Sequence, residues 1–139
     1  MSIALKKDLI IDNLIDGRLN RRQYLFSLIL IILFSFGTLL VIIFVNSFLG
    51  NILSFLVFLL LFSCSIRRLH DINLSGYYSL FFIIYFVGAA LRSQEILITG
   101  AWISIFFIIF LLFKSGSKYT NKYGPKPGGL NISRLLLNK

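Results

Sequence analysis

RRLHDINLSG, residues 67–76, is the only densely charged stretch in the middle of this 139-residue chain. Long apolar runs flank it on both sides, and runs of this length are typical of membrane spans. Charged side chains are costly in hydrocarbon, so such a stretch belongs at the membrane surface. We therefore expect residues 67–76 to be the polar connection between two helical hairpins of an all-α membrane protein.

The composition indicates a membrane protein of one small domain. Hydrophobic residues make up 58% of the chain and charged residues 14%, with a mean hydropathy of +0.89; a soluble domain is about 45–50% apolar and about 25% charged. The chain has 14 Lys and Arg against 5 Asp and Glu, a formal charge of +9. In a soluble protein this excess would indicate nucleic acid. In a membrane protein it is typical of cytoplasmic loops, so the sequence disfavours a nucleic-acid partner.

Four apolar runs are candidate transmembrane helices, at about residues 24–45, 48–66, 77–91 and 96–113. The first covers about 33 Å at ~1.5 Å per residue, which is enough to cross the hydrocarbon. The third would reach only ~22 Å, so a re-entrant segment is the alternative. Every Lys and Arg except Arg92 lies in the N-terminal segment 1–23, the central stretch or the tail 114–139. The positive-inside rule then predicts four crossings with both termini in the cytoplasm.

The two ends of the chain differ in character. Leu5, Leu9 and Leu14 recur near helical spacing, which predicts a short amphipathic helix at the membrane surface within residues 1–23, ended by Gly17.

The next apolar run is too long for a signal-peptide core and lacks a small-residue cleavage site, so we interpret it as a retained span. Gly and Pro in the tail indicate turns. The single cysteine, Cys64, excludes an intramolecular disulfide.

Three segments outside the apolar runs resemble the signatures of a known family. Residues 17–24, GRLNRRQY, resemble its opening G-R-x-x-R-x-x-Y pattern, and residues 67–78, RRLHDINLSGYY, resemble its central R-R-L-H-D-x-x-x-S-G-W-W pattern. Residues 121–125, NKYGP, resemble its closing N-x-Y-G-P pattern. The family is the small bacterial inner-membrane proteins grouped as domain of unknown function 805 (DUF805), the YhaH-like proteins. The resemblance extends over about residues 15–127, with the three segments in the expected order.

The chain departs from the family pattern at a few positions. Tyr77 and Tyr78 replace the usual tryptophan pair, Leu25 stands where tryptophan is common, Lys122 replaces arginine and Lys126 replaces an acidic residue. The resemblance implies a location in the bacterial inner membrane and a four-span architecture. It implies no activity, because the family has no generally established one.

The three signatures fall on the same side of the predicted membrane, so their polar residues can converge on one site at the cytoplasmic interface. Arginine presents a planar fork that suits phosphate and carboxylate groups, which predicts a pocket for an anionic headgroup, a nucleotide or a partner's carboxylate. The alternative is that the arginines anchor helix ends, contact bulk anionic lipid and pair with Asp16 and Asp71. The predicted site contains Arg18, Arg21, Arg22, Arg67, Arg68, His70, Asp71, Asn121 and Tyr123.

Catalysis and coupled transport are both disfavoured by what the sequence lacks. His70 and Asp71 are adjacent and so seldom face each other; we expect Asp71 to cap a turn or to pair with one of the two preceding arginines. The sequence has no second histidine and no nucleophile pattern, so we predict no catalytic residue, metal site or cofactor. None of the apolar runs holds Asp, Glu, Lys, Arg or His away from its ends, as proton-coupled and ion-coupled carriers usually do.

These observations predict a non-enzymatic integral membrane protein whose cytoplasmic basic cluster binds anionic lipid headgroups or a partner protein. The alternative is a small transporter or channel built as a homo-oligomer, since pores can form between copies. A third hypothesis is an enzyme that acts on a lipid headgroup with His70 in acid–base work.

Overall fold

The computed structural model describes residues 17–127, and this part of the chain is helical and contains no strand. The elements follow in the order α2 (Arg21–Phe44), α3 (Ser47–Asp71), the 3-10 helix η1 (Gly76–Phe82), α4 (Ile83–Ala90) and α5 (Gln94–Phe113). The prediction of an all-α protein is confirmed for the described residues. The predicted amphipathic helix falls mostly on residues 1–16, which lie outside this range, as do residues 128–139.

Three of these helices are long and apolar enough to cross a membrane. Helices α2, α3 and α5 have 24, 25 and 20 residues, with mean hydropathies of 2.9, 2.3 and 2.7 in their most apolar windows. Only 11%, 17% and 11% of the residues in those windows are buried inside the protein. Helices of a soluble protein turn their apolar faces inward. Large apolar side chains that face outward all around a helix instead indicate a surrounding hydrocarbon phase.

The segment between α3 and α5 is built differently from the other three apolar runs. It begins as η1, a 3-10 helix of 7 residues, and continues as α4, an α-helix of 8 residues. A 3-10 helix rises ~2.0 Å per residue and an α-helix ~1.5 Å, so together they reach about 26 Å. The 3-10 geometry therefore gives this short segment more length than a regular α-helix would.

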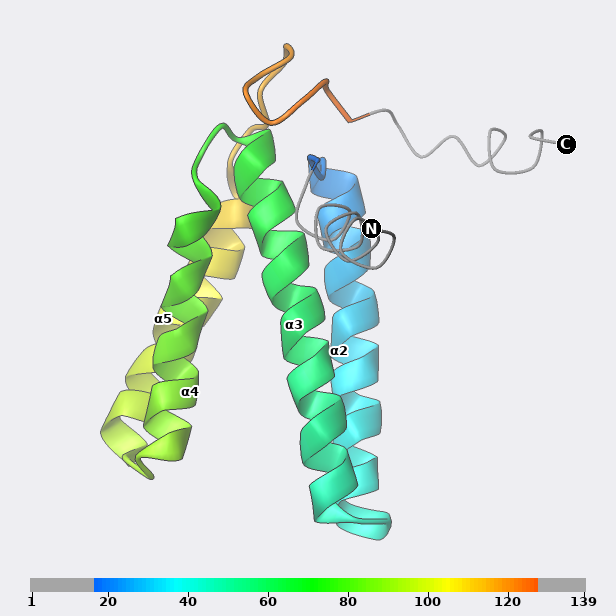
Figure 1. The fold of residues 1–139 in the computed structure, drawn as a ribbon, viewed down its shortest axis with the longest axis vertical. Coiled ribbons are helices and arrows are strands. Elements are labelled where there is room, and N and C mark those ends of the chain that lie inside the picture. Colours follow the sequence, from blue (N-terminus) through cyan, green and yellow to red (C-terminus); the bar gives the residue numbers. More distant parts are fainter. Residues whose placement is uncertain (1–16, 128–139) are drawn as a thin grey trace, which may run out of the picture.

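The helices pack as two consecutive pairs, α2 with α3 and α4 with α5 (Figure 1). Asn46 caps α3 by accepting hydrogen bonds from the backbone N–H groups of Phe48 and Leu49. Between α4 and α5, a Cβ atom on Gly88 or Gly100 would overlap the backbone of the opposite helix. Glycine at these two positions is therefore what allows α4 and α5 to approach so closely.

The two pairs lie close together at one end and separate toward the other (Figure 1). The close end contains the start of α2 and the ends of α3 and α5. Its buried core consists of Tyr24, Leu28, Leu69 and Leu111. The hydroxyl groups of Tyr24 and Ser65 lie 3.2 Å apart, within hydrogen-bond distance. This end therefore holds the two pairs together, and we call it the joined end.

Candidate functional site at the joined end

The joined end brings together three segments that are far apart in the sequence. The loop at residues 17–20 enters α2 through a capping box formed by Asn20 and Gln23, in which each side chain accepts a hydrogen bond from the other residue's backbone N–H. The backbone N–H of Leu19 donates to the carbonyl of Arg67 at 3.0 Å, which ties this loop to α3. The tail after α5 covers the same region, because the N–H of Ser117 donates to the carbonyl of Asp71 at 2.7 Å.

Arg18 lies inside this region and uses all its N–H groups. Its Nε and Nη2 atoms donate to Oδ1 of Asp71 at 3.1 and 2.9 Å. Nη1 donates to the carbonyls of Tyr119 and Gly124 at 2.9 and 3.2 Å, and Nη2 donates also to the carbonyl of Ser117 at 2.7 Å. Only 5% of the residue is exposed. The Arg18 guanidinium therefore binds the chain's own tail.

Arg68 is fully buried and joins α3 to the end of α5. Its Nε donates to the carbonyl of Leu111 at 2.9 Å, and Nη2 donates to the carbonyl of Lys114. Nη1 donates to Oδ2 of Asp71 and to the carbonyl of Leu19 at 3.3 Å. The carbonyls at a helix C-terminus lack partners within the helix and carry partial negative charge, so a guanidinium is well suited to them.

Asp71 sits between the two arginines, and the three side chains form what we call the buried clamp: Arg18, Arg68 and Asp71. Each carboxylate oxygen accepts from one of the two guanidinium groups. Gly116 packs against the carboxylate so closely that a Cβ atom there would overlap it. A buried carboxylate is stable only when charged partners and hydrogen bonds compensate for lost water. Asp71 has both, and Arg68 is one of the two partners that the sequence suggested.

Next to the buried clamp lies an open groove with a volume of 520 Å³. Arg21 and Arg22, both exposed, project from the first turn of α2. Arg21 donates from Nε to the carbonyl of Lys114 at 3.1 Å and from Nη2 to the hydroxyl of Ser115 at 2.6 Å. The cationic side chains that line the groove, which we call the basic groove, are Arg21, Arg22, Lys118 and Lys126.

Another cluster lies where the tail meets α3. The rings of His70 and Tyr123 stack with 3.8 Å between their centroids and 6° between their planes. Asn121 donates from Nδ2 to the carbonyl of His70 at 2.9 Å and accepts from the N–H of Tyr123 at 2.9 Å. The closing signature therefore fastens the tail to α3. His70 faces Tyr123, and both oxygens of Asp71 are bound to arginines, so these two neighbours do not form an acid–base dyad.

The structure thus divides the predicted site into parts with different surroundings. Arg18, Arg68 and Asp71 form the buried clamp, whereas Arg21 and Arg22 line the basic groove. His70, Asn121 and Tyr123 form the stacked cluster. Arg67 belongs to none of the three: its carbonyl accepts from Leu19, and its Nε atom is buried and makes no hydrogen bond to another described residue.

Sequence reasoning missed two residues of the groove. Lys118 and Lys126 lie in the Gly- and Pro-containing tail, where no periodicity predicts which side chains face inward. The only available signal was charge, since the tail is predicted to lie on the same side as the arginines. Across residues 17–127, no three His, Cys, Asp or Glu side chains lie close enough together to hold a metal ion.

Comparison with known proteins places the sequence signatures in a family. A family model described as "Protein of unknown function (DUF805)" matches residues 14–125, which is most of the chain. The match includes all three signature segments and confirms the resemblance inferred from them. No curated protein and no solved structure matches the chain.

Proposed function

Because the chain belongs to the DUF805 family, whose description gives no function, we propose that it is a non-enzymatic bacterial inner-membrane protein that binds the headgroup of an anionic lipid. The basic groove is the binding site in this proposal, and the buried clamp is the support that positions it. The membrane character rests on three apolar helices long enough to span a bilayer.

The proposed topology has four crossings as two hairpins, with the joined end in the cytoplasm. All basic residues within 17–127 except Arg92 lie in segments that meet at the joined end. Arg92 lies in the turn between α4 and α5, at the opposite end. Such asymmetry is the pattern that the positive-inside rule describes. The roughly 26 Å reach of η1 and α4 supports a third crossing, since a bilayer can thin slightly around a short span.

The observation that carries the proposal is the charge balance of the basic groove. Its lining contains Arg21, Arg22, Lys118 and Lys126, and its one carboxylate, Asp71, is already bound by two arginines. The groove also opens at the first turn of α2, where the helix dipole adds partial positive charge. Basic residues at a membrane surface each contribute about 1 kcal/mol toward binding anionic lipid. An anionic phosphate group therefore matches this groove in charge and in hydrogen-bond acceptors.

The test removes groove charge without disturbing the buried clamp. We expect Arg22→Gln with Lys126→Gln to reduce the anionic phospholipid retained on the purified protein about thirtyfold, since each charge contributes about 1 kcal/mol, as measured by native mass spectrometry. A matched control, Arg92→Gln with Lys122→Gln, removes the same charge outside the groove and should change retention less than twofold. Equal retention in both variants would contradict the proposal. Retention of an acidic protein in place of lipid would instead assign the groove to a protein partner.

The alternative, a small oligomeric transporter or channel, has less support from the described residues. The cavity between the two helix pairs has no Asp, Glu, Lys, Arg or His in its lining. Proton- and ion-coupled carriers usually place such residues near the bilayer midplane. Solute movement or conductance by the protein reconstituted in vesicles would favour this alternative.

A further inference from the structure

The cations of the basic groove come from two different segments of the chain. Arg21 and Arg22 belong to the first turn of α2, whereas Lys118 and Lys126 belong to the tail that follows α5. Gly116 also lines the groove, because the tail passes over this part of the joined end. The groove therefore offers donors of two separate origins, and each origin can be considered by itself.

At the start of α2, one guanidinium group and two backbone N–H groups are available to a ligand. Asn20 accepts from the N–H of Gln23, but the N–H groups of Arg21 and Arg22 make no hydrogen bond to another described residue. The exposed guanidinium of Arg22 makes none either. Backbone N–H groups at a helix N-terminus commonly bind phosphate. These donors, which we call the α2 set, together suit one phosphate group.

In the tail, two ammonium groups are available. Lys118 and Lys126 are exposed and form no hydrogen bond or ion pair with another described residue. Lysine binds phosphate as a compact point charge, so this pair, which we call the tail set, suits a phosphate as well. Arg21 connects the two sets, since its bonds to the carbonyl of Lys114 and the hydroxyl of Ser115 tie the first turn of α2 to the start of the tail.

The charge balance also favours two phosphates over one. Four cationic side chains line the groove, and its one carboxylate, Asp71, already has two arginine partners. A phosphodiester headgroup carries a single negative charge and would leave most of this positive charge without a counter-charge. The volume of 520 Å³ lies within the ~300–1,000 Å³ typical of ligand pockets, so a headgroup larger than one phosphate can be accommodated.

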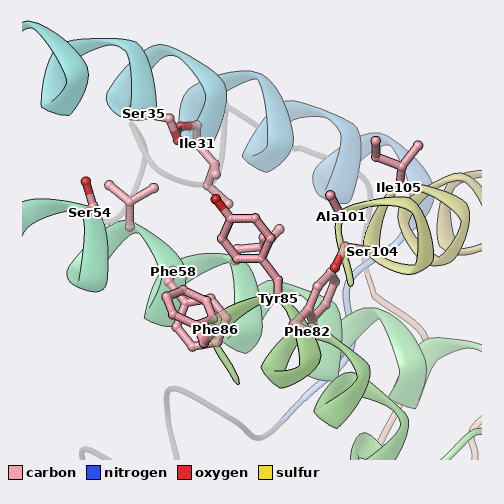
Figure 2. Close-up of a pocket in the computed structure, with 12 residues that line it drawn as sticks. Ile31, Ser35, Ser54, Phe58, Phe82, Tyr85, Phe86, Ala101, Ser104 and Ile105 are labelled. Atoms are coloured by element: carbon pink, nitrogen blue, oxygen red, sulfur yellow. Dashed lines mark hydrogen bonds between the residues drawn. The ribbon is translucent and has the colours of Figure 1, made fainter. Parts of the chain in front are cut away.

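The cavity between the two helix pairs offers a phosphate no such partners. Figure 2 shows apolar and hydroxyl-bearing side chains around it, among them Tyr85 and Phe86, and its lining among the described residues contains no Lys or Arg. A charged group moved from water into such surroundings is strongly destabilised. A headgroup with several charges is therefore directed to the joined end and not to this cavity.

We propose that the ligand of the basic groove is a lipid whose headgroup carries two phosphate groups, one bound by the α2 set and one by the tail set. This inference rests on the proposed function and names the class of anionic lipid. A lipid suits the site better than a soluble diphosphate, because Leu25 and Phe26, one turn further along α2, are exposed toward the surrounding hydrocarbon. The hydrocarbon part of the ligand can lie beside them.

The experiment compares two lipids that differ by one phosphate. Diacylglycerol diphosphate and phosphatidic acid with the same acyl chains are offered in equal amounts to the full chain in detergent, and native mass spectrometry measures the amount of each that is retained. We expect the wild type to retain about thirtyfold more of the diphosphate lipid, since its second phosphate gains two lysine contacts of the strength typical at a membrane surface.

Substitutions then test which cations read the second phosphate. Lys118→Gln with Lys126→Gln should bring the two lipids to within about threefold of each other, and both positions are exposed, so the variant should fold like the wild type. Arg22→Gln should lower retention of both lipids and keep their ratio within about twofold of the wild-type ratio. The matched control, Arg92→Gln with Lys122→Gln, removes two charges outside the groove and should keep the wild-type ratio.

The possible failures are distinguishable. Equal retention of the two lipids by the wild type, both above phosphatidylcholine, would overturn this inference and leave the proposed function standing. An unchanged ratio in the lysine variant would also overturn it. Retention of neither lipid above phosphatidylcholine would contradict the proposed function itself. Displacement of the diphosphate lipid by an equal concentration of inorganic diphosphate would overturn the assignment to a lipid, because the site would then take the free anion equally well.

Discussion

Arg18 and Arg22 are four positions apart in one signature, yet the structure gives them opposite surroundings. Arg18 is 5% exposed and donates to a carboxylate and to three backbone carbonyls. Arg22 is exposed and faces the basic groove, where no other described residue accepts a hydrogen bond from it. A run of arginines in a sequence can therefore combine structural residues with residues available to a ligand.

The difference between the two arises from where backbone carbonyls are left without partners. The end of α5 and the turns of the tail supply acceptors to Arg18 and Arg68. In a segment that must leave the membrane and turn sharply, such carbonyls need donors. Two guanidinium groups satisfy several of them at once, and Asp71 balances part of the charge. The buried clamp therefore holds the end of α3, the end of α5 and the tail together at the joined end.

Of the substitutions that test this difference, Asp71→Ala should lower the free energy of unfolding the most. It would leave two buried guanidinium groups without their carboxylate, and breaking a buried ion pair typically costs about 3–5 kcal/mol. We expect the free energy of unfolding in detergent micelles, measured by denaturant titration, to fall by that amount. Glu95→Ala, which removes an exposed carboxylate at the start of α5, is the control and should change it by less than about 0.5 kcal/mol. A small loss for Asp71→Ala would mean that the clamp contributes little.

Arg18→Lys, compared with Arg21→Lys, should have an intermediate effect. Lysine keeps the positive charge but lacks the planar fork that reaches Asp71 and the tail carbonyls together. We expect Arg18→Lys to reduce the free energy of unfolding by about 2–3 kcal/mol, since at least two buried hydrogen bonds would be lost. Arg21→Lys, at an exposed position, should change it by less than about 0.5 kcal/mol. Equal changes in the free energy of unfolding at both positions would mean that Arg18 in the clamp and Arg21 in the groove have the same structural role.

Much of the fold could be predicted from the sequence because apolar run length is a direct consequence of bilayer thickness. The ends of the helices were harder to predict. Helix α3 continues through Asp71, five residues beyond the apolar run that ends at Ile66. Charge normally indicates departure from hydrocarbon, but here Arg68 and Asp71 neutralise each other inside the helix. The 3-10 start of η1 also has no period that marks it in the sequence, since aromatic and aliphatic residues follow one another there.

The candidate site could be predicted only as a set of residues. Three signatures on one side of the predicted membrane were enough to group the arginines, His70, Asp71, Asn121 and Tyr123. Which arginine is buried depends on the backbone carbonyls of residues 111–124, and every residue type carries the same carbonyl. Side-chain patterns therefore suggested a pairing of Asp71 with Arg67 or Arg68, but they indicate neither which arginines are buried nor the path that brings Lys118 and Lys126 to the groove.

Arg22→Gln alone should have the smallest effect on the free energy of unfolding, and its effect should be confined to lipid retention. The side chain is exposed, so the free energy of unfolding should change by less than about 0.5 kcal/mol. Loss of one surface charge worth about 1 kcal/mol should lower retention of anionic phospholipid about fivefold in native mass spectra at low ionic strength. The difference from the wild type should shrink as salt is raised to about 1 M, where the Debye length falls to ~3 Å. Lys122→Gln, which removes a charge that stands over the Tyr123 ring and outside the groove, should retain lipid like the wild type. If Arg22→Gln lowered the free energy of unfolding as much as Arg18→Lys does, the two arginines would share one structural role. The proposal that the basic groove binds a ligand would then be contradicted.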